Sequence, residues 1–152
     1  SIDAFDFAQS INDAMLANIN AWIHYASKRY YAMIGDGLYG TTSGAVTKRG
    51  YILANYSKYT IGSTRIGCTW KDETNTLEGT SYLTATGDSV VVIVINPSDN
   101  AYNLTMDLPF YTTGGKGIKT TRSLNLYNQN ISLDEETCRP KVSLSASSVT
   151  TF

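Results

Sequence analysis

Arg29 lies between two aromatic residues, Tyr25 and Tyr31, in a short stretch of the chain. A guanidinium can grip a carboxylate through two parallel, charge-assisted hydrogen bonds. Aromatic faces offer flat apolar area to a sugar ring, and a tyrosine hydroxyl adds a hydrogen bond. By spacing alone, an arginine and tyrosines that follow a strand are more often surface or packing residues. Both interpretations therefore stay open at this point.

His24 is the only histidine of the chain. It precedes Tyr25 on an expected strand, so the two side chains point to opposite faces, and Trp22 shares the face of His24 as a core residue. With no second histidine, no nearby cysteine and no acid at ligand spacing, we expect no metal site and no cofactor. A buried or helix-packed His24 is favoured over a catalytic one, and no Ser-His-Asp or Cys-His set can be assembled.

The chain before residue 60 has helical spacing of its apolar residues. We expect a helix over residues 1–17, with Ser1 or Asp3 as its N-cap and a buried face made of Ile2, Phe5, Ala8, Ile11 and Met15. Residues 20–25 predict a short strand, residues 35–45 with their four glycines predict a loop, and residues 47–59 predict a second helix.

After residue 60 the apolar pattern changes to a period of two, which is typical of strands. The run from Val90 to Ile95 is apolar enough to be buried on both faces. Strands at this spacing imply a β-sandwich, with elements expected over residues 81–86, 90–95, 102–108, 120–127, 141–144 and 148–152. The sequence thus predicts a mixed α and β fold with a helical first part and an antiparallel second part.

Composition narrows the class of protein. A chain of 152 residues is long enough to bury a substantial core. Its 12 basic and 13 acidic residues give no sign of a nucleic-acid binder, and no apolar run is long enough to span a membrane. Eleven tyrosines, together with many Thr, Ser and Asn, favour a secreted, carbohydrate-facing protein.

Three motifs, in their order along the chain, resemble the C-terminal part of glycoside hydrolase family 30, closest to its glucuronoxylanases. They are NAWIHYASKRYY at residues 20–31, TKRGY at 47–51 and SVTTF at 148–152. Members of this family carry a (β/α)8 barrel fused to a β-sandwich that uses strands from both chain ends. The resemblance implies that residues 1–59 are helix seven, strand eight and helix eight of such a barrel, and that residues 60–152 belong to the sandwich.

The resemblance also implies a role for the first motif, since barrel enzymes bind substrate at the C-terminal ends of their strands. In the glucuronoxylanases a Trp, an Arg and a Tyr at this spacing hold the carboxylate of a glucuronic acid branch on xylan. Here the matching residues are Tyr25, Arg29 and Tyr31, with tyrosine in place of tryptophan. Ala32 replaces the usual glycine and residues 38–43 look like an insertion, so the branch preference could differ.

For Lys48-Arg49-Gly50-Tyr51 we expect a structural role, with the charges on the helix surface and the glycine at a close approach.

Retaining glycosidases need two carboxylates about 5 Å apart, and in the resembling family these are glutamates at the ends of strands four and seven. Both would lie upstream of Ser1, so we expect the chain by itself to be inactive. Its own acids are poor substitutes, because they decorate a helix (Asp3, Asp6, Asp13), a turn (residues 134–136) or a loop (Asp36). The implied partners are xylan and the missing N-terminal barrel portion, in the same or a separate chain.

Two questions stay open in the sequence. Cys68 and Cys138 are the only cysteines, and an extracellular context favours a disulfide that would close a loop of about 70 residues and contribute roughly 4 kcal/mol. The alternative is two separate buried thiols. For the whole chain, the alternative to an enzyme part is a non-catalytic carbohydrate-binding or structural β-sandwich with a helical N-terminal extension.

Overall fold

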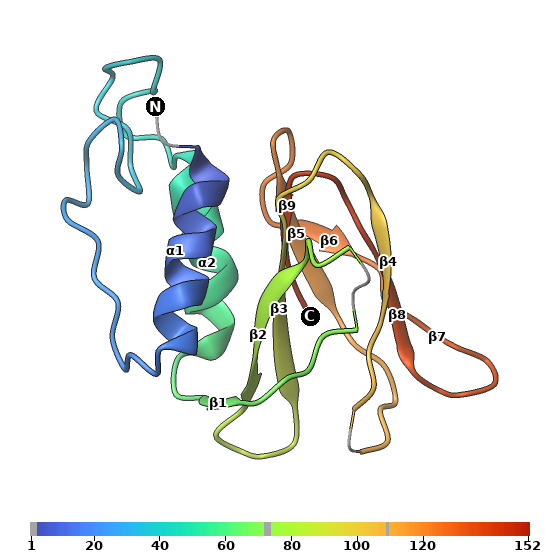
Figure 1. Ribbon diagram of the computed structural model, residues 1–152. Helices are drawn as coiled ribbons and strands as arrows, with labels where there is room; N and C mark the ends of the chain where they lie inside the picture. The colour runs from blue at the N-terminus through green and yellow to red at the C-terminus, as the bar shows by residue number, and fades with distance from the viewer. Residues whose placement is uncertain (1–2, 72–73, 109) are drawn as a thin grey trace.

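The computed structural model describes residues 3–71, 74–108 and 110–152, and within these ranges the chain forms three layers. Helices α1 (Ala4–Leu16) and α2 (Lys48–Thr60) lie side by side on one face of a six-stranded sheet, and a three-stranded sheet covers the other face (Figure 1). The predicted mixed α and β fold with a sandwich is therefore confirmed. No described helix is both long and apolar enough to cross a membrane.

Both sheets are antiparallel, and the last strand lies in the middle of the larger one. The six-stranded sheet has the order β1 (Thr64–Ile66), β2 (Glu78–Leu83), β3 (Val90–Asn96), β9 (Ser148–Thr151), β5 (Gly117–Thr121) and β6 (Tyr127–Gln129). The smaller sheet has the order β4 (Tyr102–Thr105), β8 (Pro140–Leu144) and β7 (Ser132–Leu133). Strand β9 pairs with β3 on one side and β5 on the other, so the C-terminal strand joins the two halves of the sheet.

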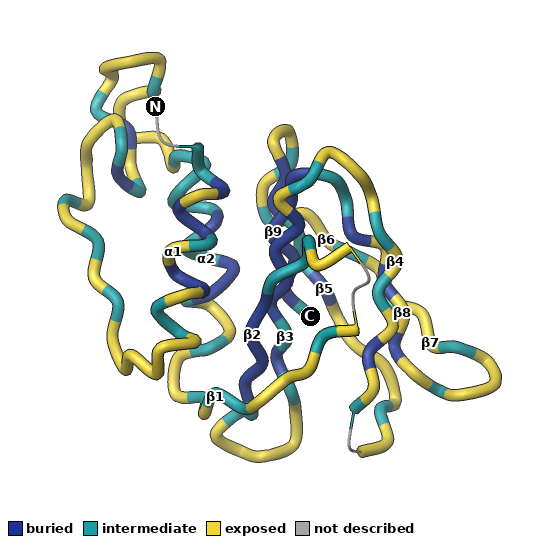
Figure 2. The backbone as a smooth tube through the Cα atoms, in the orientation of Figure 1, coloured by how far each residue is buried: buried dark blue, intermediate teal, exposed yellow. Residues whose placement is uncertain are grey.

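Strand β3 separates the two hydrophobic cores. Ile93 and Ile95 belong to the core beneath the helices, whereas Val94 belongs to the core between the sheets. This alternation follows from the period of two, which sends successive side chains to opposite faces. The prediction that this strand is buried on both faces is confirmed, and Figure 2 shows it as part of the buried centre of the molecule.

Each helix begins at a side-chain cap. Asp3 accepts a hydrogen bond from the amide of Phe5 at 3.1 Å, and Asp6 accepts one from the amide of Asp3 at 3.2 Å, which completes a capping box. Thr47 caps α2 by accepting from the amide of Gly50 at 3.3 Å. Asp3 is therefore the cap of the first helix. Ser1, the other candidate cap, and Ile2 lie outside the described residues.

Several predicted strand bounds are wrong. Residues 20–25 form no strand, because the described part of the chain places no strand beside them to pair with their backbone N–H and C=O groups. The strand expected over residues 120–127 divides into β5 and β6 around a turn in which Leu126 has a φ of 46°. Strand β4 ends at Thr105 rather than at residue 108. Strands β1 and β7 were not predicted, since three and two residues are too short for a periodic signal.

Candidate functional site

The three predicted contact residues lie on the loop between α1 and α2, which runs along the outer side of the helix pair, away from the sheets (Figure 1). Tyr25 is 78% exposed, Arg29 is exposed and Tyr31 is half-buried. Arg29 and Tyr31 share one tight turn. Tyr25 has no ring contact with Tyr31 among the described residues. The structure thus brings together Arg29 and Tyr31 but does not join Tyr25 to them.

A chain of aromatic rings connects Tyr31 to helix α1. Phe7 of α1 meets Trp22 edge-on at 5.1 Å and His24 at 5.2 Å between ring centroids. Trp22 and His24 are stacked at 5.7 Å, and the His24 ring meets Tyr31 edge-on at 6.3 Å. Such contacts stabilise a defined arrangement of rings. The prediction that His24 packs on a helix is confirmed.

The first turn of α2 holds the backbone of the same loop. The guanidinium of Arg49 donates to the carbonyl of Tyr31 at 2.7 Å and lies 5.7 Å from the centre of the Phe7 ring. The hydroxyl of Thr47 donates to the carbonyl of Ala32 at 2.5 Å. Helix α2 therefore fixes the backbone on which Tyr31 stands.

The structural role predicted for residues 48–51 agrees with their contacts, and the two charged side chains are half-buried on the surface of α2. A Cβ on Gly50 would lie 2.6 Å from the carbonyl oxygen of Met33, so the helix and the loop approach each other as expected. Lys48 does not point freely into solvent, because its ammonium donates to the carbonyl of Leu124 at 3.1 Å and to the side chain of Asn125. Partial burial lowers the pKa of Lys48. Both basic side chains therefore attach α2 to neighbouring segments.

Arg29 combines a fixed backbone with a free side chain. Its amide donates to the carbonyl of Ile34 at 3.0 Å, and its carbonyl accepts from the amide of Ala32 at 3.1 Å. Across the described ranges, the ion pairs involve other basic residues, namely Arg122, Arg139 and Lys141. The exposed guanidinium is thus presented on a hydrogen-bonded turn and has no ion-pair partner among the described residues. This arrangement leaves it available to a carboxylate from outside.

Two further tyrosines, not predicted as site residues, extend the aromatic chain. Tyr30 meets Tyr31 edge-on at 4.9 Å, and Tyr39 lies against Tyr30 at 4.4 Å between ring centroids. Tyr39 belongs to the glycine-rich segment 35–45, which forms a loop as predicted. The sequence offered one signal for Tyr39, namely an aromatic residue beside glycines in a loop close to the motif. Its contact with Tyr30 depends on tertiary structure and could not be predicted.

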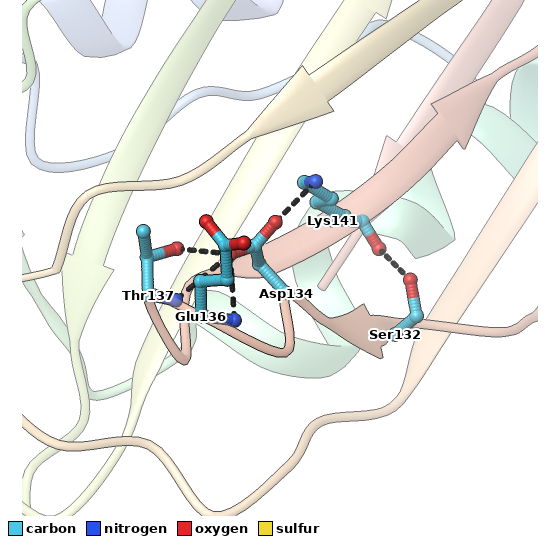
Figure 3. A network of polar contacts seen from close by, with 5 residues as sticks. All are labelled: Ser132, Asp134, Glu136, Thr137 and Lys141. Carbon is cyan, nitrogen blue, oxygen red and sulfur yellow. Dashed lines mark hydrogen bonds and ion pairs between the residues drawn. The ribbon is translucent and has the colours of Figure 1, made fainter.

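Two of the described acidic residues, Asp36 in this loop and Asp134 far from it, have structural roles. Asp36 accepts from the amide of Leu38 at 3.1 Å and so shapes the glycine-rich loop. Figure 3 shows Asp134 in the turn between β7 and β8, where it accepts from the amide and hydroxyl of Thr137 at 2.8 and 2.7 Å and pairs with Lys141. The bond from Lys141, followed by those from Thr137, holds the pKa of Asp134 well below its usual value. No group of three metal-ligating side chains occurs within the described ranges.

The predicted disulfide is absent, because Cys68 and Cys138 are both free thiols. Cys68 follows β1 and its thiol is directed at the carbonyl of Gly79 at 3.8 Å. Cys138 belongs to the turn between β7 and β8 in the smaller sheet, with its sulfur 4.0 Å from the Tyr111 hydroxyl. The two cysteines therefore flank strands of different sheets and have separate partners. The bridge was predicted from the number of cysteines, the extracellular context and their expected places at the strands of the sandwich or their edges, and the structure shows no bridge between those places.

Two hollows in the described surface lie away from the loop. One, of about 460 Å³, is at the end of the smaller sheet beside Met106 and Arg139, and the other, of about 230 Å³, is between Asn12 of α1 and Gly79 of β2. Neither is lined by Tyr25, Arg29 or Tyr31. In this chain the candidate site is consequently an open surface.

The layered fold defines a β-sandwich whose larger sheet is covered by a pair of helices. The model of the glycosyl hydrolase family 30 β-sandwich domain matches residues 62–152, which is more than half of the chain. The chain belongs to glycosyl hydrolase family 30. A search of curated proteins found no match.

Solved structures show the same fold over nearly the whole chain. The family 30, subfamily 8 xylanase Xyn30A from Clostridium acetobutylicum matches 98% of this chain and 38% of its own, with a TM-score of 0.75 and 24% identity. The catalytic domain of the family 30 xylanase C from Talaromyces cellulolyticus matches 99% and 34%, with a TM-score of 0.85 and 16% identity. A conserved exported protein from Bacteroides fragilis matches 97% and 32%, with a TM-score of 0.74 and 27% identity. The chain therefore spans about a third of the length of these structures.

Proposed function

We propose that this chain is the C-terminal part of a secreted, retaining endo-xylanase that acts on xylan with glucuronic acid branches. The observation that carries the proposal is the exposed guanidinium of Arg29, which has no described ion-pair partner and stands on a fixed turn beside Tyr31. The family membership and the xylanase names of two structural neighbours support it. Export of the Bacteroides fragilis protein supports secretion.

In this proposal Arg29 binds the carboxylate of the uronic acid branch, Tyr31 donates a hydrogen bond from its hydroxyl, and Tyr25 offers a ring face. A bidentate guanidinium–carboxylate pair has both charge and direction, so it would select a branch in a defined orientation. The carbonyl of Tyr31 is already bound by Arg49, which keeps the turn from moving when the ligand arrives. A preorganised turn costs less ordering entropy on binding.

Catalysis itself would come from two glutamates outside this chain, in the barrel portion that precedes it. Residues 1–59 would complete that barrel and residues 60–152 would form the sandwich. Support for a covering barrel comes from exposed aliphatic side chains at the end of α1 and along the loop that follows it, namely Leu16, Ile19, Ile23, Ile34 and Val46. A surface that exposes this many large apolar side chains is typical of an interaction face.

The test compares branched and unbranched substrates in the complete gene product. Arg29→Ala removes a charge-assisted contact, which costs about 2–4 kcal/mol when the partner charge stays desolvated, or roughly 30- to 1000-fold in kcat/KM on glucuronoxylan. The value on unbranched xylo-oligosaccharides should change much less. Tyr31→Phe should show the same selectivity more weakly, because it removes a single neutral hydrogen bond.

Lys28→Ala is the matched control, since it removes one exposed positive charge from the same loop. It should leave the preference for branched substrate unchanged. Equal losses of Arg29→Ala on both substrates, or no loss on either, would refute the assignment of Arg29. The 152-residue chain alone should release no reducing sugar from glucuronoxylan. Release by the pure chain would instead show that it carries its own catalytic carboxylates.

A further inference from the structure

Tyr39 is a large aromatic side chain held at the outer tip of the loop. It is 83% exposed, although its ring contacts Tyr30 at 4.4 Å with an angle of 53° between the ring planes. Tyr30 is 45% exposed and meets Tyr31 at 4.9 Å with nearly perpendicular planes. The two outer rings are thus continuous with the tyrosine of the proposed branch site, while much of their surface stays open to solvent.

The segment that carries Tyr39 is a defined turn. The amide of Gly35 donates to the carbonyl of Ala45, and the amide of Gly44 donates back to the carbonyl of Gly35, both at 2.9 Å. At the tip, the amide and hydroxyl of Thr41 both donate to the carbonyl of Leu38, at 3.1 and 2.8 Å. These bonds hold the backbone that carries Tyr39, and the contact with Tyr30 orients its ring.

Tyr39 stands at a backbone position that disfavours it. Its φ is 50°, in the left-handed region where a non-glycine residue costs about 1–2 kcal/mol. The neighbouring Gly37 and Gly40 also have positive φ, so a glycine would be the unstrained choice for the whole tip. A bulky aromatic residue at a strained and exposed position gains little for the stability of this chain. Strain of this kind clusters where a side chain is used to contact a ligand.

We propose that Tyr39 and Tyr30 form an aromatic platform that binds an uncharged sugar ring of the xylan main chain, next to the branch held by Arg29. The pair offers ring faces and no cationic group, so its chemistry suits the apolar face of a neutral pentose ring and not a uronate. This inference rests on the proposed function of the same loop. It adds a determinant for the main chain, supplied by the glycine-rich segment that distinguishes this sequence.

The test is a comparison of KM and kcat in the complete gene product. Tyr39→Asn removes the ring, and asparagine tolerates the left-handed backbone better than most residues. We expect KM to rise about three- to tenfold on both branched and unbranched xylo-oligosaccharides, since one stacking contact of ordinary strength is lost, with kcat nearly unchanged. Tyr39→Phe keeps the ring and should behave as the unmodified enzyme does.

Tyr111→Asn is the matched control, because Tyr111 is 86% exposed on the other side of the fold and should not affect KM. An unchanged KM in Tyr39→Asn would overturn the inference. A lower melting temperature with an unchanged KM would also overturn it, and would show that Tyr39 packs against the rest of the enzyme. The proposed function can fail independently of this inference. In that case Arg29→Ala would lower the activity on branched and unbranched substrates equally, or on neither, while Tyr39→Asn would still raise KM on the unbranched substrate. That result would support the aromatic platform and refute the branch site.

Discussion

Two buried asparagines provide a direct test of how α2 is attached to the sheet. Asn55 of α2 is fully buried, and its amide nitrogen donates to the hydroxyl of Thr120 in β5 at 2.8 Å. Its amide oxygen lies 3.2 Å from the hydroxyl of Thr151 in β9, whose proton it shares with the backbone carbonyl of Asn55 at 2.9 Å. Asn12 of α1 is buried to the same degree, at 1% exposure, but its amide oxygen has no hydrogen-bond partner among the described residues. The same substitution at both positions therefore separates burial from hydrogen bonding.

The expected cost follows from these contacts. Asn55→Ala removes two hydrogen bonds between helix and sheet, at about 0.5–1.5 kcal/mol each, and leaves a small cavity that adds roughly 1 kcal/mol. The better helix propensity of alanine returns about 0.5 kcal/mol. The net loss in the free energy of unfolding is about 2–3 kcal/mol. For a chain of this length, that lowers the melting temperature by roughly 6–9 °C.

Asn12→Ala should lower the free energy of unfolding by about 1 kcal/mol or less. It removes the same side-chain atoms and changes helix propensity in the same way as Asn55→Ala, but the amide oxygen of Asn12 has no described partner to lose. The assay is urea unfolding of the purified protein, followed by circular dichroism and supported by thermal melts. Equal shifts of the midpoint in the two variants would refute the reasoning. So would a larger shift for Asn12→Ala, which would mean that its amide is satisfied by a segment outside the described residues.

Two further predictions concern stability. Gly50→Ala should lower the free energy of unfolding by about 1–3 kcal/mol in spite of alanine's helix propensity, because its Cβ would meet the carbonyl oxygen of Met33 at 2.6 Å. Gly67→Ala, whose Cβ would meet nothing within 4 Å, is the control, and a stabilised Gly50→Ala would contradict the packing. Asp134 has a lowered pKa in the folded state, so its stabilising effect is present above its ordinary value of 3.8 and is lost as the pH falls below it. The melting temperature of Asp134→Asn should therefore lie below that of the unmodified protein at pH 7, with the difference narrowing towards pH 2; a difference independent of pH would contradict this role for the carboxylate.

Features set by neighbours along the chain were predictable from the sequence. The caps at Asp3 and Thr47 depend on side chains within three residues of the amides they bind, so the helix starts were visible in the sequence. The long apolar run of β3 predicted a strand buried on both faces, because its period and length leave little choice. The motif around Arg29 and the strand-rich second half were sufficient to indicate family 30, to which the chain belongs.

Tertiary structure decided the features that depend on partners distant in sequence. Strand β9 pairs with β3, about 55 positions earlier in the chain, and with β5, about 30 positions earlier, and no local pattern specifies either pairing. Residues 20–25 carry a strand-like pattern but form no strand, since a strand is stable only when its backbone groups find a partner. Cys68 and Cys138 are free thiols that flank strands of two different sheets, and no local pattern in the sequence specifies which sheet each cysteine adjoins. Tyr39 reaches Tyr30 because the glycine-rich loop folds back on itself, and ring contacts of this kind exist only once the loop has closed.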